Sequence, residues 1–74
     1  MDKELVKFIR NLFGMTQNDF GKQLGFSRTY VMMIECGYRA ISKRYEDQIM
    51  RTFNLSVEDI IKYKELKHSV RNAI

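Results

Sequence analysis

The pattern of glycines, with no proline anywhere, is the feature that most constrains how this chain of 74 residues folds. Without proline no helix is forced to break, and glycine is the residue that most often ends one. Gly14, Gly25 and Gly37 each follow a segment in which apolar residues recur at three- and four-residue spacing. The sequence therefore predicts a compact all-α fold of five helices, forming a single domain over residues 1–74.

Hydroxyl residues mark the starts of four of these helices. Thr16, Ser27, Ser42 and Ser56 each precede a segment with helical periodicity. Their side chains can accept hydrogen bonds from the free amide groups of a first helical turn. The residues predicted to face the core are Leu5, Val6, Ile9, Leu12, Phe13, Phe20, Leu24, Val31, Ile34, Tyr45, Ile49 and Phe53. The apolar positions of the fifth predicted helix are Val57, Ile60 and Ile61. The apolar pattern loosens after this, so residues 62–74 are expected to form a C-terminal tail or an extension of the fifth helix.

Composition excludes several classes of function. Cys36 is the only cysteine and His68 the only histidine, so an intramolecular disulfide and a Cys/His zinc site are excluded, and no catalytic triad can be assembled. We therefore expect no enzyme activity, metal, cofactor or small-molecule ligand. No run of 18 apolar residues and no signal-peptide pattern is present, which predicts a cytoplasmic protein without membrane contact. The net charge of +4 favours a polyanionic partner.

The segment from Thr16 to Arg39 has the pattern of a helix-turn-helix. Two short predicted helices are separated by a turn that contains Gly25, which can adopt a positive φ angle. Gly21 has no side chain, so the second helix of the pair can cross close to it. Four apolar residues are spaced to hold the two helices at a fixed angle, namely Phe20, Leu24, Val31 and Ile34.

This segment resembles the Cro and phage-repressor type of helix-turn-helix regulators. The residues that carry the resemblance are Arg10, Gly14, Thr16, Gln17, Phe20, Gly21, Leu24, Gly25, Val31, Ile34, Glu35, Gly37, Ile41, Ile49, Asn54, Leu55 and Ser56. It covers roughly residues 3 to 61 and implies a lambda-repressor-like fold. Two departures are present: the family usually has alanine where Gly21 stands, and often has proline where Ala40 or Ile41 stands.

The resemblance implies that the third helix enters the major groove of double-stranded DNA. Its outward face would read the bases through Ser27, Arg28, Thr29, Met32 and Met33. Arg28 is the strongest candidate, since a guanidinium can donate two hydrogen bonds to guanine. The two methionines could pack on thymine methyl groups, and the alternative for each is a place in the core.

The same resemblance implies contacts that fix the protein on the DNA backbone. The candidate phosphate-binding residues are Asn11, Gln17, Tyr30, Tyr38, Arg39, Lys43 and Arg44, for which the alternative is an ordinary solvated surface. Arg10 and Glu35 occupy positions that form a structural ion pair in parts of the family. If they pair here, they tie the first helix to the end of the recognition helix.

The function predicted is that of a sequence-specific transcriptional regulator, a Cro-like repressor of a phage or mobile element. It is expected to bind a palindromic operator as a homodimer through Leu55, Ile60, Leu66 and Val70 and the segment 62–74. A restriction-modification controller protein and an antitoxin-type regulator remain alternatives. In a further alternative the fold serves as a protein-interaction module, with Met32 and Met33 in a hydrophobic docking patch.

Overall fold

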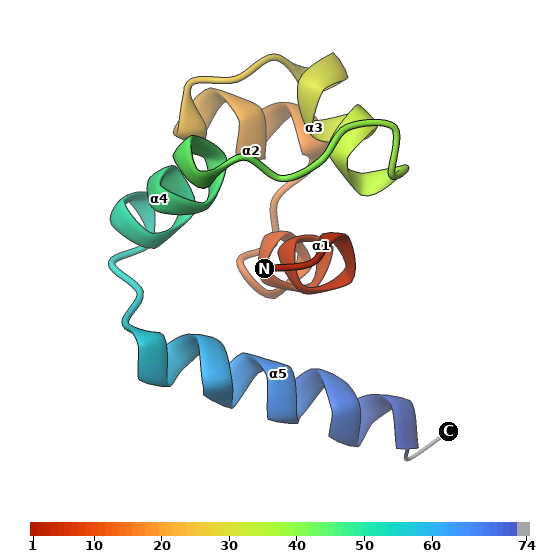
Figure 1. Ribbon diagram of the computed structural model, residues 1–74, viewed down its shortest axis with the longest axis vertical. Coiled ribbons are helices and arrows are strands. Elements are labelled where there is room, and N and C mark those ends of the chain that lie inside the picture. The colour runs from red at the N-terminus through yellow and green to blue at the C-terminus, as the bar shows by residue number, and fades with distance from the viewer. Residues whose placement is uncertain (73–74) are drawn as a thin grey trace.

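Five helices make up the part of the chain that the computed structural model describes, residues 1–72. They are α1 (Lys3–Leu12), α2 (Gln17–Leu24), α3 (Arg28–Glu35), α4 (Lys43–Thr52) and α5 (Val57–Asn72). Figure 1 shows α1 at the centre, with α2 and α3 on one side of it and α5 on the other. The predicted five-helix all-α architecture is confirmed, and α5 continues well past residue 62 as a helical extension.

The predicted hydroxyl caps form at the starts of four helices. Thr16 Oγ1 accepts a hydrogen bond from the Asp19 amide at 3.1 Å, and Ser27 and Ser42 cap α3 and α4 in the same way. Ser56 and Asp59 form a reciprocal box, in which each side chain accepts from the other's amide at 3.2 and 2.9 Å. These hydrogen bonds lower the pKa of the Asp59 carboxyl from its ordinary value. Local capping chemistry thus places every helix start after α1.

Nine fully buried side chains form a core between α1, α2, α3 and α4. They are Leu5, Val6, Ile9, Phe20, Leu24, Val31, Ile34, Tyr45 and Ile49. All nine were predicted to face inward. Phe53, Ile60 and Tyr63 are partly buried and pack against this core.

Two residues predicted to face the core are exposed instead. Leu12 and Phe13 at the end of α1 are 46% and 40% exposed, although the ring of Phe13 stacks on that of Phe53. Their spacing was read correctly as helical, but the prediction that they are buried was wrong. On α5, the apolar residues Val57 and Ile61 are 70% and 52% exposed, because α5 packs mainly on α1 and only one side of it meets the core.

Across residues 1–72, no helix is both long enough and apolar enough to cross a membrane.

Candidate nucleic-acid interface

Two glycines shape the turn between α2 and α3. Gly25 ends α2 with φ +80° and ψ 29°, a left-handed conformation that disfavours residues with a Cβ. A Cβ on Gly21 would lie 2.6 Å from the backbone oxygen of Phe26. Gly21 is therefore required by the returning turn, and the alanine usual in the resembling family would force this turn to open.

The N-terminal half of α3 presents its candidate base-reading residues to solvent. Arg28 and Thr29 are exposed, and Met32 is 40% exposed. Met33 is half-buried, so it is shared between the outer face and the interior. Ser27 is exposed, but its Oγ already accepts the Tyr30 amide at 3.0 Å. Arg28 and Thr29 are thus the freest polar groups on this face.

Cys36 lies on the same helical stripe as Thr29 and Met32, at the C-terminal end of α3. It is an exposed free thiol, and its spacing of four and seven residues from the other two places it on their face. Cys36 was not among the predicted site residues, although helical spacing places it beside Thr29 and Met32.

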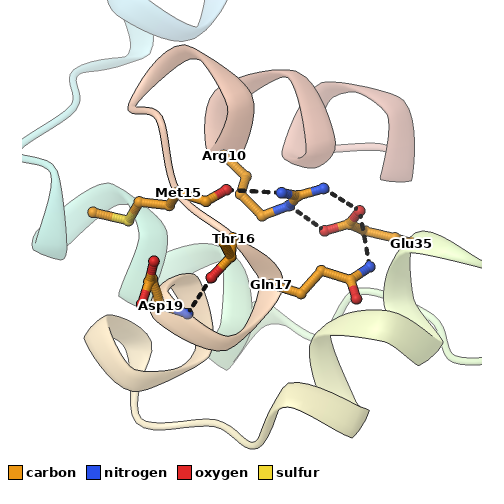
Figure 2. A network of polar contacts seen from close by, with 6 residues as sticks. All are labelled: Arg10, Met15, Thr16, Gln17, Asp19 and Glu35. Atoms are coloured by element: carbon orange, nitrogen blue, oxygen red, sulfur yellow. Dashed lines mark hydrogen bonds and ion pairs between the residues drawn. The ribbon is translucent and has the colours of Figure 1, made fainter.

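A buried ion pair joins α1 to α3 at the base of the helix-turn-helix. Arg10 Nε donates to Glu35 Oε2 at 2.7 Å and Nη2 donates to Glu35 Oε1 at 3.0 Å. Arg10 Nη1 also donates to the Met15 carbonyl at 2.8 Å, just before α2 begins. The two side chains are only 12% and 5% exposed. Figure 2 shows that one guanidinium thereby connects the entry to α2 with the end of α3.

Gln17 and Tyr45 also lie near this ion pair. Gln17 Nε2 donates to Glu35 Oε1 at 3.4 Å, so its side chain is turned toward the ion pair (Figure 2). Tyr45 is fully buried, and its hydroxyl has no hydrogen-bond partner among the described residues. Burial, and then the negative charge of Glu35, raise the pKa of Tyr45 well above its ordinary value. Gln17 and Glu35 are thus engaged in contacts within the fold, whereas the buried hydroxyl of Tyr45 is not.

The candidate phosphate-binding residues lie in three kinds of environment. Gln17 is half-buried at the ion pair, whereas Asn11 and Tyr38 are exposed, Tyr38 to 79%. The ring of Tyr30 is half-buried and stacks on Phe26 with ring centroids 4.6 Å apart. Tyr30 is therefore primarily a packing residue, which the sequence pattern did not show.

The cationic candidates gather beside the turn and the first part of α3. Arg39, in the connection between α3 and α4, lies over the Tyr30 ring, and Arg44, in the first turn of α4, lies over the Phe26 ring. Lys43 and Arg44 also line a shallow surface hollow on α4, together with Asp47, Gln48 and Arg51. Arg51 was not among the predicted phosphate-binding residues, although its four-residue spacing from Asp47 puts it on this face of α4.

Comparison with known proteins places this geometry in a family. The profile described as helix-turn-helix matches residues 6–60. The chain belongs to this family, whose fold is the lambda-repressor-like helix-turn-helix and whose members include DNA-binding transcriptional regulators. In this helix-turn-helix protein the matched residues include all of α2, α3 and α4.

Curated relatives of this helix-turn-helix protein come from archaea. An uncharacterised HTH-type transcriptional regulator of Methanocaldococcus jannaschii is 35% identical over 63 residues, which cover 85% of this chain and 96% of that protein. An uncharacterised HTH-type transcriptional regulator of Archaeoglobus fulgidus is 33% identical over 60 residues, or 81% of this chain and 84% of the relative. No solved structure matches the chain significantly.

Proposed function

We propose that this protein is a sequence-specific transcriptional regulator that inserts α3 into the major groove of double-stranded DNA. The observation that carries the proposal is the exposed first turn of α3, in which Arg28 and Thr29 stand free of intramolecular partners among the described residues. Arg28 is placed to donate two hydrogen bonds to guanine, and Thr29 to contact a neighbouring base. Met32 and the exposed part of Met33 contribute apolar contacts to thymine methyl groups.

Phosphate contacts by Arg39, Lys43, Arg44 and Tyr38 hold α3 in register on the duplex. Asn11 contributes from α1. The N-terminus of α2, where Gln17 stands, is oriented by the ion pair of Arg10 with Glu35. The protein acts without catalysing a reaction and without a cofactor, in the cytoplasm.

The regulator is proposed to act as a homodimer on a palindromic operator, with recognition helices about 34 Å apart. Of the residues predicted for the interface, Leu55 and Ile60 pack against the core of their own chain, while Leu66 is 46% exposed. The side chain of Val70 lies outside the described residues. The proposed interface is therefore the side of α5 that presents Leu66, together with the segment 62–74. Val57 and Ile61 are also exposed but lie about half a helical turn away from Leu66, on another side of α5. Sedimentation of the wild type and Leu66→Glu tests the interface, since a dimer should dissociate in the variant, and Ile61→Glu is the matched control on the other side.

Selection of bound duplexes from a random pool tests the function. The expected result is a palindrome with guanine at one fixed position in each half-site. Arg28→Ala should cost about 1–3 kcal/mol of binding free energy and relax the preference at that position alone. Lys43→Ala should weaken binding to all duplexes alike, and Lys62→Ala on α5 is the matched control for loss of one charge. Failure to retain any duplex at low salt contradicts the proposal and favours a protein-interaction module that docks through Met32 and Met33.

The biological role proposed is that of a Cro-like repressor of a phage or mobile element, which blocks a promoter by occupying it. It is supported by the resemblance of residues 3 to 61 to that group. Reporter expression from a promoter that carries the selected operator should fall when the protein is produced. A rise in expression contradicts repression and favours the alternative of a restriction-modification controller, and co-purification with a toxin favours that of an antitoxin-type regulator.

A further inference from the structure

Two arginines and two aromatic rings form one continuous stack beside the start of α3. The guanidinium carbon of Arg39 lies 4.8 Å from the centroid of the Tyr30 ring, and that of Arg44 lies 5.5 Å from the centroid of Phe26. The two rings are stacked on each other, with centroids 4.6 Å apart and planes inclined by 22°. The order is therefore Arg44, Phe26, Tyr30, Arg39, with one cation at each end.

This stack rests on the core. Tyr45, fully buried, meets Phe26 edge-on with ring centroids 5.0 Å apart and lies 5.5 Å from Tyr30. Close packing of the interior restrains the rings from beneath. The positions of the two guanidinium groups are thus coupled to the core that also positions α3.

Stacking leaves the hydrogen-bonding edges of both arginines available. A guanidinium contacts an aromatic ring through its flat face, whereas its N–H groups point outward in the plane. Neither side chain donates a hydrogen bond or joins an ion pair within the described residues 1–72, and both residues are exposed. The free edges have the planar geometry that matches two oxygens of a phosphate.

We propose that Phe26 and Tyr30 are positioning residues that hold Arg44 and Arg39 as two preset phosphate-binding arms, one on each side of the first turn of α3. The proposal rests on the proposed function, because the phosphates are those of the operator backbone. An unrestrained arginine loses side-chain entropy when it is fixed by a phosphate, so restraint before binding favours association. The rings thereby contribute to DNA affinity without contacting DNA.

A double-mutant cycle between Tyr30 and Arg39 tests this proposal, with the affinity for the selected duplex measured over a range of salt concentrations. Tyr30→Leu should lower the affinity by about two- to fivefold, the size of one ordered cation–π contact, for every duplex alike. Tyr30→Phe keeps the ring and should bind like the wild type. Arg39→Ala should reduce the slope of log affinity against log salt by about 0.9, the value for one lost phosphate contact.

The decisive variant is Tyr30→Leu combined with Arg39→Ala. If the ring acts through the arginine, adding Tyr30→Leu to Arg39→Ala causes almost no further loss of affinity. Equal losses in both backgrounds overturn the proposal, since the tyrosine then acts on its own or through stability. The affinity of Arg39→Lys is a second test, because lysine keeps the charge but lacks the planar group that stacks on the ring. This affinity should fall, and wild-type affinity in this variant also overturns the proposal.

Phe26→Leu with Arg44→Ala repeats the cycle at the other end of the stack. Urea unfolding of each variant identifies any that fails to fold. If Tyr30→Leu fails to fold, the affinities of Arg39→Lys and Tyr30→Phe still test the proposal. Failure of the wild type to bind any duplex refutes the proposed function itself. If the wild type binds duplex normally but the affinity losses of the single variants simply add in the double variants, only the positioning role is refuted.

Discussion

Replacement of Arg10 by methionine is expected to destabilise this helix-turn-helix protein strongly, because it leaves a nearly buried carboxylate without its counter-ion. The variant leaves the Glu35 carboxylate, which is 5% exposed, with only the Gln17 amide at 3.4 Å as a donor. It also removes the donor to the Met15 carbonyl. Breaking a buried ion pair by removing one partner costs about 3–5 kcal/mol.

This loss is large compared with the stability of the whole chain. At about 0.05–0.15 kcal/mol per residue, 74 residues have a free energy of unfolding of about 4–11 kcal/mol. The melting temperature of Arg10→Met should therefore fall by at least about 12 °C. Urea unfolding followed by circular dichroism measures the free energy directly. Lys7→Met, an exposed site on the same helix, is the matched control and should change the free energy by less than about 0.5 kcal/mol.

The double variant Arg10→Met with Glu35→Leu separates the ion pair from the packing around it. Removing both charges leaves no buried carboxylate without a counter-ion, so most of the stability should return. Recovery should be incomplete, because the Met15 carbonyl still lacks its donor, at a cost of about 1 kcal/mol. The reasoning is refuted if the free energy of unfolding of Arg10→Met lies within about 1 kcal/mol of the wild-type value, or if the double variant is less stable than the single one.

Three other predictions concern single groups. Tyr45→Phe removes a buried hydroxyl without a partner and should raise the free energy of unfolding by about 1 kcal/mol. Tyr63→Phe is the control. A decrease of that size in Tyr45→Phe would show instead that the hydroxyl is hydrogen-bonded. Gly25→Ala should lower the free energy of unfolding, measured by urea unfolding, by about 1–2 kcal/mol, because φ at this position is +80°. An unchanged free energy contradicts the claim that a Cβ is disfavoured in this turn. The pKa of Asp59 is lowered in the folded protein, so its carboxylate stabilises the start of α5 at pH values above 3.8, the ordinary pKa of this group. This contribution is lost as the pH falls through the lowered pKa. The protection of amides at the start of α5, taken relative to their intrinsic exchange rates at each pH, should therefore fall in acid, and this fall should be absent in Asp59→Asn.

Local features of this fold could be predicted from the sequence because their causes lie within a few residues. Thr16, Ser27, Ser42 and Ser56 cap helices through amide groups three positions away, and the chemistry of Gly25 belongs to a single turn. The inward positions of α2 and α3 followed from helical spacing in the same way. Family resemblance supplied the placement of α3 as the reading helix.

Apart from the ion pair of Arg10 with Glu35, which the family resemblance implied, features that depend on contacts between distant segments could not be predicted. Arg39, in the connection after α3, stacks on Tyr30 in the first turn of α3, and Arg44, in the first turn of α4, stacks on Phe26 in the turn before α3. Helical periodicity describes a face but not what covers it, so it could not show that Val57 and Ile61 are exposed. The coverage of α5 is decided by the angle at which it lies on α1.

The central position of α1 separates the two surfaces on which the proposed function depends. Helices α2 and α3 lie on one side of α1 and α5 on the other (Figure 1). A protein engineer can therefore change Arg28 and Thr29 to redirect DNA specificity while leaving α5 as it is. Equally, a reporter domain or an affinity handle joined beyond α5 extends from the side opposite the reading helix. The arrangement makes the chain suitable as a scaffold in which target choice and assembly are altered separately.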